Sequence, residues 1–273
     1  MQMWAADGEA GLMRGSGGEF RRIGPPGEAL CHWQGRVFCA GAGMCRGYLE
    51  STGEMVAELS LPGGICGLAP LGDCICALSA EADCLCAFCP RTGEMRLSAP
   101  AGVYPRDLCL SPCGRFLAVA GGAAGEMLLF DQQLCCLQQL RLPGVCCGVC
   151  FLARGMAALC AVGEGELSAR LIGVSPRGVT EEMLAFPDVP CSLCALPGGG
   201  CLMGCNGQVI ALRGDGRVLR RISCGYPARI RHAWGRALIC DLCPGEIFTP
   251  AGERLYRGGA PWDVLALPRF RPI

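Results

Sequence analysis

Short hydrophobic runs alternate with turn-forming residues along the whole chain. In residues 84–100, CLCAFCPRTGEMRLSAP, two β-rich runs flank a Thr-Gly-Glu turn, and STGEM at 51–55 nearly repeats the RTGEM of 91–95. Glycine supplies the positive φ that a tight strand reversal needs, so each phrase is typical of a β-hairpin turn. The pattern therefore predicts antiparallel strands and hardly any helix.

The hairpin turn recurs at a nearly constant spacing. In residues 130–144 the strands remain, with Gln133-Leu134 in place of the glycine. The other turns carry Gly17, Gly53, Gly93, Gly178, Gly216 and Gly252. Successive turns are about 36 to 44 residues apart, and the distance from the last turn through both chain ends to the first is one more period. A repeat of this length that closes on itself is typical of a β-propeller.

A second marker, a strand–glycine turn–strand unit, runs through the same repeats, as in YPRDLCLSPCGRFLAVAG at 104–121. Its last copy, at 260–273, stops after one strand, whereas residues 1–26 supply three strands without an inner partner. We therefore expect an all-β, single-domain fold: a seven-bladed β-propeller of four-stranded antiparallel blades, in which the N- and C-terminal strands share the closing blade. The other six blades are predicted at 27–63, 64–102, 103–144, 145–188, 189–225 and 226–259.

Residues 104–131, YPRDLCLSPCGRFLAVAGGAAGEMLLFD, resemble the repeat of YVTN-type (YncE-like) β-propellers, which are related to WD-repeat and NHL propellers. In that repeat a proline opens the inner strand, a Ser-Pro-x-Gly turn follows, and an aspartate, here Asp131, ends the third strand. Glu50 and Pro90 stand at the aspartate position of two other blades, so the resemblance implies a degenerate member. The Gly-His…Trp-Asp signature of WD repeats is absent, because the Trp-Asp pair at 262–263 opens an inner strand instead.

The composition limits the classes of partner. Hydrophobic residues make up 51% of the 273 residues and charged ones 18%, which is ample material for cores between blades. The 24 basic residues balance the 24 acidic ones, whereas a nucleic acid or an anionic membrane calls for a basic excess. No apolar run reaches membrane-spanning length and the N-terminus lacks the pattern of an export signal, so we expect a cytoplasmic monomer.

The 24 cysteines fall mainly inside predicted strands. In a reducing compartment they are expected to stay as thiols and to pack as small hydrophobic residues. Four Cys-x-x-Cys spacings occur, but residues i and i+3 of a flat strand point to opposite faces and cannot chelate together. Only Cys240 and Cys243, in CDLCPG, resemble half of a zinc knuckle at a turn, and no second half is evident. No cofactor is expected.

The loops that lead into the inner strands carry the candidate binding residues. Enzymatic propellers place their chemistry where these loops converge, and aromatic, Arg and Asp side chains there would suit a small polar or anionic ligand. The candidates are Tyr104, Arg106, Asp107, Tyr226, Arg229, Trp262 and Asp263. In the alternative interpretation, Tyr-Pro only shapes the turns and Arg–Asp pairs seal the mouth of the channel.

The two histidines, His32 and His232, precede the turn glycine of two inner strands by three residues. They are predicted at the opposite end of the channel from the candidate binding residues. Two histidines could act as general bases or metal ligands, but a hydrogen-bonding cap on the turn is the favoured interpretation.

No sequence motif for nucleotide binding, hydride transfer or Ser-His-Asp catalysis is present. The leading hypothesis is a non-catalytic binding or scaffold propeller for a protein or a small polar ligand. The alternative is a lactonase-type hydrolase whose pocket would hold Arg106, Asp107, Arg229 and Asp263. A third hypothesis is a metal or redox protein built on Cys240 and Cys243, and fold analogy alone decides none of these.

Overall fold

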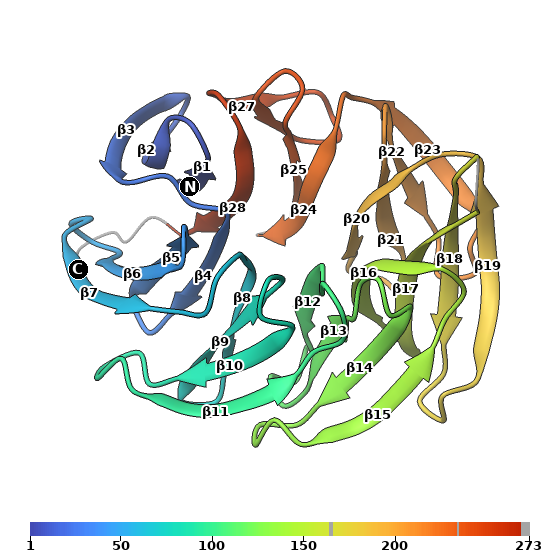
Figure 1. The fold of residues 1–273 in the computed structure, drawn as a ribbon. Coiled ribbons are helices and arrows are strands. Elements are labelled where there is room, and N and C mark those ends of the chain that lie inside the picture. Colours follow the sequence, from blue (N-terminus) through green and yellow to red (C-terminus); the bar gives the residue numbers. More distant parts are fainter. Residues whose placement is uncertain (164–165, 234, 269–273) are drawn as a thin grey trace.

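A computed structural model describes residues 1–163, 166–233 and 235–268. Within these ranges the chain forms seven four-stranded antiparallel sheets and no helix, so it contains no helix that could span a membrane. The sheets surround a central axis like the blades of a propeller (Figure 1), which confirms the predicted seven-bladed fold. Parts of three predicted blade segments, residues 164–165, 234 and 269–273, lie outside the described residues.

One strand of each blade lines the central channel. These inner strands are β4 (Ala29–Trp33), β8 (Ile65–Leu71), β12 (Asp107–Leu110), β16 (Val145–Leu152), β20 (Pro190–Ala195), β24 (Pro227–Ala233) and β28 (Pro261–Leu267). All of them begin on the same side of the ring, which we call the front face, and end on the other side, the rear face. The front face therefore also carries the turns between the second and third strands of each blade.

The remaining strands follow in order toward the rim. The second strands are β1 (Gln2–Asp7), β5 (Arg36–Gly41), β9 (Cys74–Ser79), β13 (Leu117–Ala120), β17 (Gly155–Val162), β21 (Cys201–Cys205) and β25 (Arg236–Asp241). The third strands are β2 (Gly11–Ser16), β6 (Met44–Leu49), β10 (Cys84–Phe88), β14 (Glu126–Phe130), β18 (Ser168–Val174), β22 (Gln208–Leu212) and β26 (Glu246–Phe248). The outer strands are β3 (Glu19–Gly24), β7 (Met55–Ser60), β11 (Met95–Pro100), β15 (Cys136–Arg141), β19 (Thr180–Phe186), β23 (Val218–Ser223) and β27 (Arg254–Arg257).

The ring is closed by strands from the two ends of the chain. Strand β28 pairs with β1 in an antiparallel register that places Trp4 opposite Leu265 and Ala5 opposite Val264. The closing blade therefore has the strand order β28-β1-β2-β3, with one C-terminal and three N-terminal strands (Figure 1). This arrangement confirms the predicted closure, because β28 supplies the inner partner that the three N-terminal strands lack.

The turn glycines explain the repeat. All six glycines predicted at the hairpin turns have a positive φ, for example 80° at Gly53 and 75° at Gly93. In the one blade without a turn glycine, Leu134 takes the left-handed conformation itself, with φ of 56°, and its side chain is buried. Burial of the leucine side chain offsets a backbone conformation that costs an L-residue roughly 1–2 kcal/mol.

The residues equivalent to Asp131 in blades one and two are not the ones predicted from the sequence. The Asp131 N–H bonds to the Cys135 carbonyl, and the same closing bond is made by the N–H of Cys89 and of Leu49. Cys89 and Leu49, not Pro90 and Glu50, therefore stand at the aspartate position. The error arose because the turns of these two blades are one residue longer than the turn that follows Asp131.

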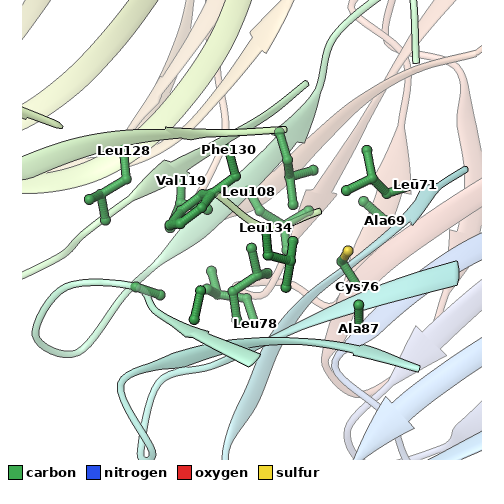
Figure 2. Close-up of a cluster of buried hydrophobic side chains, with 14 residues drawn as sticks. Ala69, Leu71, Cys76, Leu78, Ala87, Leu108, Val119, Leu128, Phe130 and Leu134 are labelled. Carbon is green, nitrogen blue, oxygen red and sulfur yellow. The ribbon is translucent and has the colours of Figure 1, made fainter. Parts of the chain in front are cut away.

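Neighbouring blades pack face to face through small and branched side chains. Between the second and third blades, Leu78 and Ala87 meet Leu108, Val119 and Phe130 in one buried cluster (Figure 2). The thiol of Cys76 lies in the same cluster, as expected for a cysteine that fills space as a small hydrophobic residue. Second strands such as β9 are consequently buried on both faces, whereas exposed and half-buried side chains alternate along much of outer strands such as β7.

Candidate functional site

The structure divides the seven predicted site residues between two layers. Exposed on the front face are Tyr104, Arg106, Tyr226 and Trp262. Deeper, in the central channel, lie Asp107, Arg229 and Asp263. Residues adjacent in sequence are separated because successive side chains of an extended chain point in opposite directions.

The first channel pair joins blades three and six. Arg229 Nη1 donates to Asp107 Oδ1 at 2.5 Å, and Nη2 donates to the Cys66 carbonyl at 2.8 Å. The second carboxylate oxygen of Asp107 accepts from the Val149 N–H at 3.3 Å. The buried Nε of Arg229 has no acceptor among the described residues. The pair therefore ties inner strands β8, β12, β16 and β24 together across the channel.

The second channel pair joins blade six to the closing blade and to blade one. Arg231 donates to both oxygens of Asp263, from Nε at 2.9 Å and from Nη2 at 2.7 Å. Asp263 is fully buried and also accepts from the Leu30 N–H at 2.9 Å. Arg231 was not among the predicted site residues, although the two-residue spacing in Arg229-Ile230-Arg231 places both guanidiniums on one face of β24.

The pKa values of the two carboxylates are shifted in opposite directions. Burial raises the pKa of Asp107, and Arg229 counteracts only part of that effect. Burial also acts to raise the pKa of Asp263, but the Arg231 guanidinium outweighs it and holds the pKa below the ordinary value. Both channel arginines are thus engaged by carboxylates of the protein itself.

The channel retains a cavity of about 350 Å³, to which all seven inner strands contribute. Its wall includes Asp107, Arg229 and Arg231, and the rest is mainly Leu and Cys with the two histidines. Each arginine is paired with a carboxylate, Arg229 with Asp107 and Arg231 with Asp263. This arrangement matches the alternative in which Arg–Asp pairs seal the channel. A small anion would have to compete with a buried carboxylate for either arginine.

The histidines lie at the rear end of the channel, as predicted. His32 Nε2 is 2.9 Å from Glu50 Oε2, which links the inner strand of blade one to the turn between β6 and β7. His232 lines the same cavity from β24. The His32–Glu50 contact favours the hydrogen-bonding role over catalysis.

Tyr104 is held in an unusual backbone conformation on the front face. It has φ of 53°, and its N–H donates to Asp83 Oδ1 at 2.6 Å. A side chain at Gly122 would collide with the Tyr104 carbonyl, so this glycine is required by the close approach of the two backbones. The Arg106 guanidinium lies 5.2 Å from the centre of the tyrosine ring, and 49% of Tyr104 is exposed.

Tyr226 and Trp262 also follow loops fixed by carboxylates. Asp241 accepts from the N–H of Gly225 and of Tyr226, both at 2.7 Å. Asp7 accepts from the N–H groups of Gly259 and Ala260, at 3.0 and 3.1 Å, just before Trp262. The side chains are 37% and 39% exposed, respectively.

The three aspartates that hold these loops, Asp7, Asp83 and Asp241, were not among the predicted site residues. Asp7 and Asp241 end the second strand of two blades, so their equivalent positions in the repeat were the available signal. Asp7 is fully buried, which acts to raise its pKa, but four backbone and side-chain donors, including Tyr256, outweigh burial and lower it. The three exposed aromatic residues of the front face therefore rest on rigid supports.

The cysteines do not assemble into a site. Cys240 is buried in β25, whereas Cys243 is exposed in the next turn. Among residues 1–163, 166–233 and 235–268, no three Cys, His, Asp or Glu side chains are placed to hold a metal ion. Burial raises the pKa of most of the thiols, for example that of Cys66 to about 12. Such thiols are chemically inert.

Three thiols have a lowered pKa instead: Cys89, Cys113 and Cys160. Although only 7% of Cys89 is exposed, we expect it to be alkylated at pH 7 before the buried thiols whose pKa is raised. The Thr92 hydroxyl and nearby backbone N–H groups lower the pKa of Cys89 to about 7, so roughly half of it is thiolate at that pH. It lines a rear-face cavity of about 220 Å³ together with Arg91 and Arg96. Brief iodoacetamide labelling followed by peptide mass spectrometry shows which thiols react first.

The matched control for Cys89 is a Thr92→Val variant, which removes the hydroxyl. It should slow the labelling of Cys89 and leave that of the exposed Cys113 unchanged. Labelling of Cys89 no faster than that of Cys76, which is also buried and whose pKa is raised to about 12, would contradict the expectation.

Comparison with known proteins identifies the fold and not the family. No known protein-family profile matches the chain, and no curated protein matches its sequence. In structure it is similar to a "putative 6-phosphogluconolactonase" from Bacteroides uniformis, with a TM-score of 0.74 and 12% identity over 97% of this chain and 98% of that one. The WD40 repeats of RRP9 give a TM-score of 0.70 and 12% identity over 88% of this chain and 83% of that one.

A third neighbour, hydrazine synthase of Kuenenia stuttgartiensis, gives a TM-score of 0.69 and 12% identity over 82% of this chain and 76% of that one. Proteins with such different names share the architecture, so the likeness shows a seven-bladed propeller related in shape to WD40 repeats and to lactonase-like propellers. The YVTN-type resemblance stays a prediction, and the function has to be argued from the site.

Proposed function

We propose that the protein is a non-catalytic binding propeller that engages a protein partner through its front face. The observation that carries the proposal is the set of three exposed aromatic residues, each on or directly after a loop that a carboxylate holds in place: Tyr104, Tyr226 and Trp262. Tyr and Trp combine an apolar ring with a polar tip and are enriched at protein interfaces.

The chemistry of these residues suits a protein interface. Tyr, Trp and Arg are the residue types that contribute most of the free energy at interface hot spots, and Arg106 lies beside Tyr104. Loops already fixed in one conformation lose little entropy on binding. The left-handed Tyr104 adds support, because a non-glycine residue is kept in such a conformation only where the surroundings enforce it.

The hydrolase alternative receives less support from the channel. Of its four candidate residues, Asp107 and Arg229 bond to each other, Asp263 is fully buried against Arg231, and only Arg106 is exposed. A general base or a phosphate-binding arginine needs an open coordination position, and these groups already occupy each other. Similarity to both WD40 and lactonase-like propellers favours neither function.

A triple variant, Tyr104→Ala/Tyr226→Ala/Trp262→Ala, tests the proposal. Immobilised wild-type protein is expected to retain a partner protein from a cell extract. The triple variant should retain at least about tenfold less of that partner. The matched control is Met95→Ala/Leu137→Ala/Leu219→Ala, which removes three exposed apolar side chains from outer strands. Thermal unfolding verifies that both variants fold, and equal retention by all three proteins would contradict the proposal.

A further inference from the structure

The charges of the two faces differ although the whole chain is neutral. Among the described residues, the front-face loops carry one arginine, Arg106, against six carboxylates: Glu9, Glu28, Glu81, Asp83, Glu166 and Asp188. The rear-face loops are balanced, with seven carboxylates against six arginines. These are Glu50, Glu54, Asp73, Glu94, Asp131, Asp215 and Glu253 against Arg91, Arg115, Arg154, Arg177, Arg213 and Arg217.

None of the six front-face carboxylates takes part in an ion pair with a described residue. The nine ion pairs of the described chain lie in the channel, along the blades and on the rear face. Glu28 of blade one and Glu81 of blade two are close enough to repel each other, because burial together with the Glu81 charge raises the pKa of Glu28. Like charges left next to each other without a cation do not stabilise the fold.

Building on the front-face binding proposed above, we propose that the partner presents a basic segment, with Arg or Lys side chains next to apolar ones. The carboxylates supply charge complementarity and the exposed aromatic residues supply apolar contact and cation–π partners. Both kinds of residue occur around the ring: Glu28 precedes β4, Tyr104 precedes β12 and Asp188 precedes β20, and Tyr226 and Trp262 follow at β24 and β28. An extended segment crossing the front face would therefore meet both kinds of group.

The same charges argue against other occupants. A second copy docked front to front would bring two acidic surfaces together, and a nucleic acid or an anionic membrane would be repelled. A divalent cation is disfavoured because no three carboxylates of the described residues converge. A basic protein segment remains as the complementary partner.

Two labelled synthetic peptides provide the probe: a twelve-residue alternating Arg-Leu peptide and its Glu-Leu counterpart. Fluorescence anisotropy with the full chain is expected to show binding of the Arg-Leu peptide, weakening steeply with salt, and none of the Glu-Leu peptide. A front variant, Glu28→Gln/Glu81→Gln/Asp188→Asn, should weaken binding about tenfold or more. The matched rear variant, Glu54→Gln/Glu94→Gln/Asp73→Asn, should bind like the wild type.

The outcomes separate this inference from the proposed function. Failure of the Arg-Leu peptide to bind, or equal weakening by the front and rear variants, overturns the basic partner. If the aromatic triple variant still loses its captured protein in that case, front-face binding stands without the charge preference. If the front variant loses the peptide but the aromatic variant retains both peptide and captured protein, the charge preference stands and the aromatic site is wrong.

Discussion

Deletion of residues 260–273 is expected to abolish cooperative unfolding and to cause aggregation. The deletion removes β28, whose Val264 is fully buried, and leaves the edge of β1 without its partner. It also removes Asp263, so that Arg231 would lie in the channel without its carboxylate. An exposed strand edge beside newly exposed apolar surface favours pairing with other chains. Size-exclusion chromatography and denaturant unfolding measure both effects.

The control for the deletion is addition of the missing segment in trans. A synthetic peptide of residues 260–273 should restore a cooperative transition to the shortened chain, because the strand lies at the inner edge of the closing blade and pairs with β1 alone in its sheet. A shortened chain that elutes at its monomer mass and unfolds with wild-type cooperativity would contradict the closure as a source of stability.

The fold could be predicted because its signals are local and repeated. A positive φ at a turn needs glycine, so Gly53, Gly93 and their counterparts marked the hairpins and their spacing gave the number of blades. Leu134 is the instructive exception, because its local sequence gave no turn signal and only the period placed it. Tertiary burial, which the sequence does not display, stabilises that turn.

The site could be predicted only in part, because side-chain direction and partners depend on the ring. Arg106 and Asp107 are neighbours in sequence, yet one is exposed and the other is buried against Arg229 from a blade 122 residues away. The supports of the front face have the same character, since Asp7 bonds to residues at the far end of the chain. No pattern within one repeat predicts contacts between repeats.

Substitution of Asp263 by Ala is expected to lower the free energy of unfolding by about 3–5 kcal/mol, the usual effect of removing one partner of a buried ion pair. The change leaves the Arg231 guanidinium and the Leu30 N–H without their acceptor. Denaturant titration measures it. The double variant Arg231→Met/Asp263→Leu should recover most of the loss, and Glu182→Gln, which breaks an exposed pair with Arg170, should cost less than about 1 kcal/mol.

The pH dependence separates the ion pair from simple packing. The folded-state pKa of Asp263 is lowered, so its stabilisation is complete above the ordinary value of 3.8 and is lost as the pH falls through the folded-state pKa. The difference in unfolding free energy between the wild type and Asp263→Ala should therefore shrink on acidification.

The pKa of Asp107 is raised instead, so its contribution to the unfolding free energy has the opposite pH dependence and declines as the pH rises through the folded-state pKa. Asp107→Asn should accordingly make stability fall more steeply with acid than in the wild type. If the unfolding free energies of the wild type and both variants change in parallel with pH, the pKa values of the two channel carboxylates are not shifted in opposite directions.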